Sequence, residues 1–273
     1  MNQVTSQVTS KDGTSIVFDR SGDGPALILV LGATATRAME AHMPPVAPEI
    51  DLATHFTVYV YDRRGRGDSG DTAPYAVERE IEDLAAMIDA AGGSAYVLGH
   101  SSGAVLALRA AGKLGSKIKK LALYEPPFII DDSRPPLPAD YVPQLRAYIA
   151  DGRPADALKY FMRVAVNIPE EYLAGAETWP TWAGSVAAAR TISYDGEIMG
   201  DTMSGNPATL DQFATITTPT LVMDGGASPS FMHNGAETLA KILPHAQHRR
   251  LAGQDHGAAP EALNPVLIEF FGR

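Results

Sequence analysis

The sequence predicts an α/β fold in which a doubly wound, mostly parallel sheet is flanked by helices. Short β-rich runs recur along the chain, amphipathic helical patterns alternate with them, and most of the runs are continuously apolar. A continuously apolar strand is typical of a parallel sheet whose two faces are both covered by helices. The alternation of strands and helices further indicates right-handed crossovers between parallel neighbours.

Seven β-rich runs bounded by Gly, Pro or Asp are expected to form strands: residues 15–19, 26–31, 56–62, 95–99, 119–125, 218–224 and 248–252. Helical patterns cover residues 76–91, 103–114, 236–243 and 260–271. In the first of these, Ile81, Leu84 and Ile88 recur at helical spacing, and Gly92 provides a natural C-terminal stop.

The alternation breaks between residues 126 and 207. Helix-like runs at residues 142–151, 155–166 and 183–192 are separated by proline-containing breaks, and no convincing strand occurs among them. We expect a helical cap or lid inserted over the functional site. Residues 1–125 and 208–273 would then form one core domain, since no internal repeat or long linker indicates another.

Composition and charge narrow the class of protein. The chain has 273 residues, of which 45% are hydrophobic and 20% charged, as in an ordinary globular protein. A formal net charge of -10 argues against nucleic-acid and anionic-membrane partners, because polyanions would be repelled. The lack of any cysteine excludes disulfides and thiolate catalysis.

Targeting signals are not evident either. Residues 1–13 are polar, and no apolar run reaches the roughly 18 residues that span a bilayer. We therefore expect a cytoplasmic protein that acts on a small molecule. A monomer and a homodimer both stay open.

A glycine-flanked serine is the strongest chemical signal. The expected strand 95–99 leads into Gly99-His100-Ser101-Ser102-Gly103, and a helical pattern follows immediately. This strand–turn–helix context is that of a nucleophile elbow, a sharp turn that presents the serine oxygen above the sheet edge. The backbone N–H of Ser102, at a helix N-terminus, can donate to a developing oxyanion. We predict Ser101 as the nucleophile.

With these residues the sequence resembles the α/β-hydrolase superfamily, and within it the bacterial esterase-like serine hydrolases, over nearly the whole chain. A second likeness is Asp62-Arg63-Arg64-Gly65-Arg66-Gly67-Asp68-Ser69, which is similar to the family's Asp-x-Arg-Gly-x-Gly-x-Ser turn. The resemblance implies the α/β-hydrolase fold, and it implies that this turn has a largely structural role.

The general base is expected at His256. It lies in a loop after the last expected strand, which resembles the family's histidine loop. His100 is adjacent to Ser101 but would point away from it, so packing of the elbow is its expected role.

Two positions compete for the acid that orients the histidine. Asp224 ends the expected strand 218–224 and fits the chain order Ser, Asp, His, so it is preferred. Glu125 is the alternative, because it follows an earlier strand and some relatives place the acid there. Asp255 is disfavoured, since a residue directly beside His256 rarely reaches its Nδ1.

The oxyanion hole is expected from the backbone N–H groups of Ala33 and Ser102. The family usually has a His-Gly pair after this strand, whereas this chain has Leu31-Gly32. Only backbone donors are required, so the missing histidine does not remove the hole.

Other motifs carry less weight. Residues 65–70 match the dinucleotide glycine spacing but do not open a helix, and no metal-ligand spacing occurs. No cofactor and no metal are expected. Aromatic and methionine side chains of the insertion could line an apolar pocket or pack the cap: Tyr148, Phe161, Met162, Tyr172, Trp179, Trp182, Tyr194, Met199 and Met203.

These features together predict a serine hydrolase that cleaves a carboxylic ester, lactone or thioester through an acyl-enzyme. Three alternatives stay open: an acyltransferase, a cofactor-free lyase or oxygenase on the same fold, and a non-catalytic ligand-binding homologue. Covalent trapping of Ser101 separates the predicted serine hydrolase from the lyase or oxygenase and from the non-catalytic homologue.

Overall fold

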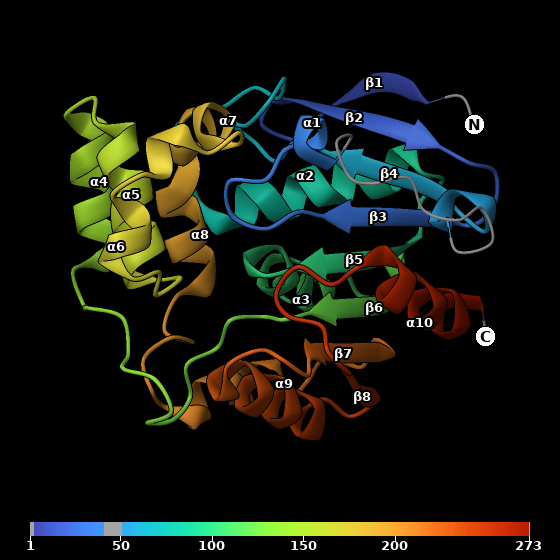
Figure 1. The fold of residues 1–273 in the computed structure, drawn as a ribbon. Helices are drawn as coiled ribbons and strands as arrows, with labels where there is room; N and C mark the ends of the chain where they lie inside the picture. The colour runs from blue at the N-terminus through green and yellow to red at the C-terminus, as the bar shows by residue number, and fades with distance from the viewer. Residues whose placement is uncertain (1–2, 41–50, 273) are drawn as a thin grey trace.

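The computed structural model describes residues 3–40 and 51–272 and shows an eight-stranded sheet crossing the molecule (Figure 1). The strand order is β1-β2-β4-β3-β5-β6-β7-β8. Strands β4, β3, β5, β6, β7 and β8 run parallel, and β1 and β2 are antiparallel at one edge. The strands are β1 Val4–Thr9, β2 Ser15–Ser21, β3 Ala26–Val30, β4 Thr57–Tyr61, β5 Ala95–His100, β6 Ile118–Tyr124, β7 Thr220–Gly225 and β8 Ala246–Leu251.

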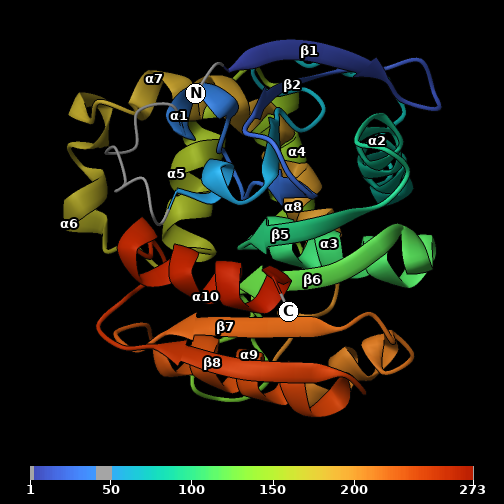
Figure 2. The ribbon, with the colours of Figure 1, turned by 90° about the vertical axis from the view of Figure 1, so that its right-hand side faces the viewer.

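Helices cover both faces of the sheet, so the expected doubly wound fold class is confirmed (Figures 1 and 2). On one face, α2 (Val77–Ala90), α3 (Ser102–Leu114) and α9 (Ser230–Ile242) bury the larger hydrophobic cluster. On the other face, α10 (Pro260–Gly272) packs against a second cluster that includes Leu27, Phe56 and Leu251. Burial on both faces is the reason that the central strands are continuously apolar.

One strand was not predicted from the sequence. Strand β1 pairs with β2 in antiparallel register from Val4↔Arg20 to Thr9↔Ser15, and nearly all of its residues are exposed. A polar edge strand has little apolar signal because only one of its sides is paired and its faces contact water. The segment 1–13 therefore reads as a polar tail although much of it belongs to the sheet.

Residues 126–207 form helices and no strand, as expected from their sequence pattern. They contain α4 (Tyr141–Ala150), α5 (Pro154–Val164), α6 (Glu170–Leu173), α7 (Trp182–Ala188) and α8 (Ile192–Met199). Figure 1 places these helices together at the left, beside the sheet edge toward which β3, β5 and β6 point. The domain boundaries at 126 and 207 stay a prediction.

This helical insertion, residues 126–207, has a small core of its own. Tyr141, Leu145, Leu158 and Ile192 are buried together, with Trp182 packed against them. Pro154 stands at the first position of α5, where its fixed φ and missing N–H cost nothing. Among the described helices, none is long and apolar enough to cross a membrane.

Candidate active site

Ser101 occupies the sharp turn between β5 and α3. Its backbone is in an unusual conformation for a non-glycine residue, with φ 56° and ψ −128°, and its N–H donates to the Tyr124 carbonyl at 3.0 Å. A Cβ on Gly103 would lie 2.2 Å from the carbonyl oxygen of Val30, so only glycine permits this approach. Strain held by surrounding structure is typical of a functional turn. The elbow residues Gly99 and His100 end β5.

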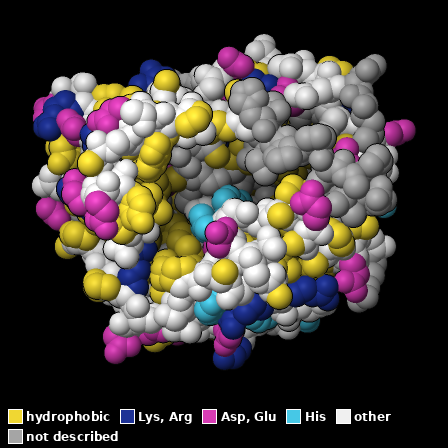
Figure 3. Space-filling model, viewed as in Figure 1, with side chains coloured by type: hydrophobic (Ala, Val, Ile, Leu, Met, Phe, Trp, Pro, Cys, Tyr) yellow, Lys and Arg dark blue, Asp and Glu magenta, His cyan; other side chains and the backbone are white. Residues whose placement is uncertain are grey.

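A cavity of about 410 Å³ opens in front of the elbow. Figure 3 shows this face hollowed between the helical insertion and the core, with hydrophobic side chains on its walls and histidine at its rim. The predicted catalytic positions that line it are Ser101, Ser102, Ala33, Glu125 and His256. Asp224 is not among the lining residues.

Part of the expected apolar set also lines this cavity. Phe161, Met199 and Met203 of the insertion face it, together with Phe231 and Met232 of α9. The other aromatic residues of the set do not line it. Tyr148 and Trp182 pack the insertion's own core, Tyr194 stacks on Tyr75, Trp179 is partly buried, and Tyr172 is 65% exposed.

His256 is oriented by Glu125. Its Nδ1 lies 2.7 Å from Glu125 Oε2, and the second carboxylate oxygen, Oε1, accepts the Gly225 N–H at 2.8 Å. Burial alone would raise the pKa of Glu125, but hydrogen bonds, with that from His256 foremost, bring the pKa below its ordinary value. An ionised Glu125 accepts from Nδ1–H, which leaves Nε2 of a neutral His256 as a proton acceptor.

Asp224 was the preferred acid, and the structure corrects that expectation. Its fully buried carboxylate accepts hydrogen bonds from His233 Nδ1 at 2.5 Å, Arg250 Nε at 2.6 Å and His248 Nε2. All of its partners belong to α9 and β8, so the carboxylate stays with them and does not contact His256. The alternative named from the sequence, Glu125, is the residue that contacts the histidine.

His100, expected only to pack the elbow, and Tyr124, which was not predicted as a site residue, both contact the histidine loop. His100 Nε2 lies 2.8 Å from the backbone carbonyl of His256, and the Tyr124 hydroxyl donates to the carbonyl of Asp255. Burial, together with the charge of His256, lowers the pKa of His100 to about 4. His100 is therefore neutral at pH 7, and its Nε2–H donates to the carbonyl. This contact with the histidine loop was not predicted from the sequence.

The loop expected to form part of the oxyanion hole lies against Ser101. A Cβ on Gly32 would lie 2.9 Å from the Ser101 Cβ, so glycine is needed at this point. Arg66 Nη1 donates to the Gly32 carbonyl at 2.7 Å, which fixes the peptide that precedes Ala33.

A buried charge network connects this loop, the elbow and the helical insertion. Asp195 of α8 accepts the Ser102 hydroxyl at 2.7 Å, Arg63 Nη1 at 2.7 Å and Arg66 Nη2 at 2.5 Å. Burial alone would raise the pKa of Asp195, but the guanidinium groups of Arg66 and Arg63 bring it below the ordinary value. These four residues are named the Asp195 network below.

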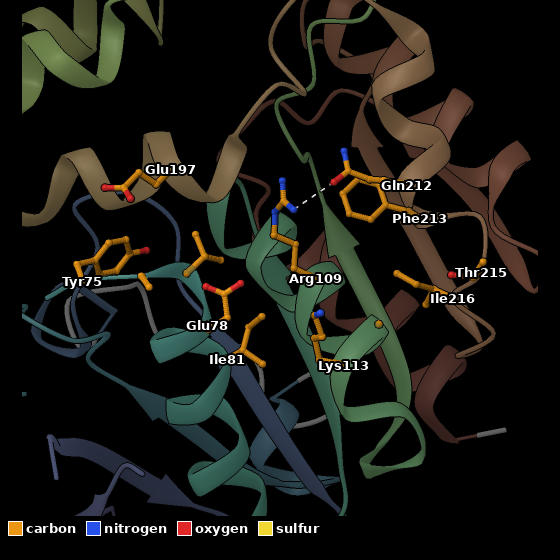
Figure 4. Close-up of a pocket in the computed structure, with 13 residues that line it drawn as sticks. Tyr75, Glu78, Ile81, Arg109, Lys113, Glu197, Gln212, Phe213, Thr215 and Ile216 are labelled. Carbon is orange, nitrogen blue, oxygen red and sulfur yellow. Dashed lines mark hydrogen bonds between the residues drawn. The ribbon is translucent and has the colours of Figure 1, made fainter. Parts of the chain in front are cut away.

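A second, more open depression lies elsewhere, between α2, α3, α8 and η6 (Pro207–Phe213) (Figure 4). Its side chains include Glu78, Arg109 and Gln212, and Arg109 Nη1 donates to Gln212 Oε1 at 3.2 Å. None of the predicted catalytic residues lines it, so it is not the candidate active site.

Comparisons with known proteins agree with this fold. The profile described as "Alpha/beta hydrolase family" matches residues 27–266. A crystal structure of an α/β hydrolase from Sphaerobacter thermophilus shares 53% identity, covers 97% of this chain and 100% of that chain, and superposes with a TM-score of 0.87.

Two curated relatives match over a shorter length. N-formylmaleamate deformylase from Pseudomonas putida is 37% identical over 109 residues, which is 39% of either chain. Lipase LipV from Mycobacterium tuberculosis is 31% identical over 113 residues, 41% of either chain. The match thus spans about two fifths of each curated relative. Because the family profile covers most of the sequence, this chain belongs to the alpha/beta hydrolase family.

Proposed function

We propose that this protein is a serine hydrolase that cleaves a carboxylic ester, lactone or thioester through a Ser101-His256-Glu125 triad. The observation that carries the proposal is the 2.7 Å contact between His256 Nδ1 and the buried Glu125 carboxylate, beside the cavity that Ser101 lines. A base held by a carboxylate next to a strained serine is the arrangement that nucleophilic catalysis requires.

The reaction would proceed in two acyl-transfer steps. His256 Nε2 takes the proton of Ser101 as its Oγ bonds to the acyl carbon, and the imidazolium then gives that proton to the leaving alkoxide. In the second step His256 deprotonates a water, the water oxygen bonds to the acyl carbon, and Ser101 regains its proton. Glu125 stabilises the imidazolium in both steps without being protonated.

The remaining residues would stabilise and position the reacting groups. The backbone N–H groups of Ala33 and Ser102 are proposed to bind the oxyanion, and the helix α3 dipole favours negative charge at the same point. We propose that the helical insertion acts as a cap, because Phe161, Met199 and Met203 reach from it into the cavity. The cytoplasmic location and the small-molecule partner stay predictions.

Hydrolysis of an acyl C–N bond is a second candidate. It is favoured by the likeness to the N-formylmaleamate deformylase, although that match covers 39% of the chain. The same acyl-enzyme would form, with an amine or amide nitrogen as the leaving group that His256 protonates.

Covalent trapping tests the proposal. After treatment with a small fluorophosphonate, intact-mass analysis should show one phosphonyl adduct per chain in the native protein and none in Ser101→Ala. Fluoride would leave as the Ser101 Oγ bonds to phosphorus. Absence of an adduct from the native chain, or an adduct that persists in Ser101→Ala, would remove Ser101 from the proposed role.

A further inference from the structure

A buried arginine lines the cavity beside the proposed nucleophile. Arg134 lies in the loop between β6 and α4, its side chain is 7% exposed, and it shares the cavity with Ser101 and His256. No role was expected for it from the sequence, and the proposed acyl-transfer steps do not use it.

Its known contacts hold the guanidinium without neutralising it. Arg134 Nη2 donates to the Val164 carbonyl at the end of α5 at 2.8 Å, and its Cζ lies 4.9 Å from the ring centroid of Phe231. A carbonyl and an aromatic face stabilise a cation but carry no formal charge. One contact comes from the helical insertion and the other from α9, so the side chain is held from both walls of the cavity.

The other buried arginines among the described residues form ion pairs, and Arg134 does not. Among the described residues, five arginines are less than one tenth exposed, and four of them form ion pairs: Arg37, Arg63, Arg64 and Arg66. No described carboxylate lies within ion-pair distance of Arg134. A buried cation without a counter-ion is costly, which argues that its partner arrives with a ligand.

Three acidic residues line the cavity, and none of them pairs with Arg134. Asp255 Oδ1 accepts the Gly257 N–H at 2.9 Å. Glu125 contacts His256 and the Gly225 N–H, and Asp195 is held by Arg63 and Arg66. Burial lowers the pKa of Arg134, and only Tyr141 opposes that effect electrostatically. The guanidinium nevertheless keeps its charge at neutral pH because arginine titrates so far above that range.

We propose that Arg134 binds a carboxylate of the substrate, so that the preferred substrates are esters or lactones that carry a free carboxylate elsewhere in the molecule. The inference rests on the proposed function for the identity of the cleaved bond. The attraction between the buried guanidinium and a carboxylate does not depend on that bond. Arg134 would thus be a specificity-determining residue, and Ser101 and His256 would perform the chemistry on the other part of the substrate.

Matched substrates test this specificity. We would use 4-nitrophenyl monoesters of linear dicarboxylic acids from glutaric to suberic acid, and compare each with the same ester whose free carboxylate is replaced by a carboxamide. Because a hydrogen bond to a charged group is stronger than a neutral one, the anionic ester should have a kcat/KM at least about tenfold higher at the best chain length. Equal kcat/KM for the two forms at every length would overturn the proposal.

Variants assign the preference to Arg134. Arg134→Met should lower kcat/KM for the anionic ester until the preference is lost, and it should leave kcat/KM for the neutral carboxamide ester within about threefold of the native value. Arg134→Lys should retain part of the preference for the anionic ester. The matched control is Arg153→Met, since Arg153 also lies over an aromatic ring, 5.0 Å from the Tyr148 centroid, but is exposed. An equal loss on both esters in folded Arg134→Met would contradict the proposal.

A binding measurement separates this inference from the proposed function. Calorimetric titration of the native chain with the free dicarboxylates and with the corresponding diamides should show tighter binding of the dicarboxylate, by about tenfold or more. If no ester is hydrolysed and no fluorophosphonate adduct forms, the proposed function fails and this titration still decides the role of Arg134. If Arg134→Met does not fold, Arg134→Lys and the native titration decide it, and equal binding of dicarboxylate and diamide would overturn it.

Discussion

Replacing Glu125 with glutamine should lower kcat for ester hydrolysis by on the order of 10³- to 10⁴-fold, with little change in fold. The amide nitrogen of glutamine can donate to His256 Nδ1, which stabilises the tautomer whose proton is on Nε2. That tautomer cannot accept the Ser101 proton. Steady-state kinetics on the best ester found in the panel, with circular dichroism as the check on folding, measure the effect.

The matched control is Asp224→Asn, because it makes the same change at the carboxylate that ends the neighbouring strand. Asp224 contacts His233, His248 and Arg250 and does not contact His256. We expect kcat for Asp224→Asn within about threefold of the native value at a temperature where the variant is folded. The opposite ranking, with Asp224→Asn inactive and Glu125→Gln active, would overturn the assignment of Glu125.

Asp195→Asn should destabilise the fold by about 3 to 5 kcal/mol in the free energy of unfolding, since it leaves the buried guanidinium groups of Arg63 and Arg66 with one carboxylate fewer. The new amide N–H would also face a guanidinium donor. We expect kcat of the folded variant to fall by about 10²-fold as well, because Arg66 holds the Gly32 carbonyl and Asp195 holds Ser102. Urea denaturation and steady-state kinetics measure the two effects.

An exposed carboxylate of the helical insertion gives the comparison. Asp156 pairs with Arg153 at 2.7 Å, and both side chains are roughly half exposed. Asp156→Asn should change the free energy of unfolding by less than about 1 kcal/mol, because surface ion pairs contribute little. Similar effects of Asp195→Asn and Asp156→Asn would contradict the role given to the Asp195 network.

The sequence did not allow us to decide which carboxylate, Glu125 or Asp224, contacts His256. Glu125 follows β6 and Asp224 lies near the end of β7, and the register pairs Tyr124 with Met223, so the two carboxylates leave the same sheet edge side by side. A strand pattern locates both at this edge but does not tell which one turns toward His256. Asp224 is bound instead by His233 and His248, and these hydrogen bonds come from α9 and β8.

The contacts that support the expected oxyanion loop could not be predicted from the sequence either. The turn that contains Arg63 and Arg66 was expected to be largely structural. Asp195 lies beyond the helical run expected at 183–192 and has no motif around it. The contacts with Asp195 join residues more than 90 positions apart, such as Ser102 with Asp195. Such a contact depends on how α8 packs on the core, and no local sequence pattern predicts it.

The fold itself was largely accessible from the sequence. Short β-rich runs predicted seven of the eight strands within a few residues. Most of these runs are continuously apolar, because burial on both faces leaves a strong local signal. The helical run expected at 183–192 is divided in the structure, where α7 ends at Ala188, a 3-10 turn covers Ala189–Thr191 and α8 begins at Ile192. Periodicity detects helical residues well but detects a break without glycine or proline poorly.

Acylation of Ser101 during turnover would show that this serine is the nucleophile. The chain would be mixed with the best 4-nitrophenyl ester, quenched with acid within the first turnover and digested with trypsin, which releases Ser101 in the peptide of residues 80–109. We predict that this peptide gains the mass of one acyl group, with fragmentation placing it on Ser101, and that Ser101→Ala gains none. Turnover with the acyl group on another residue would contradict this prediction.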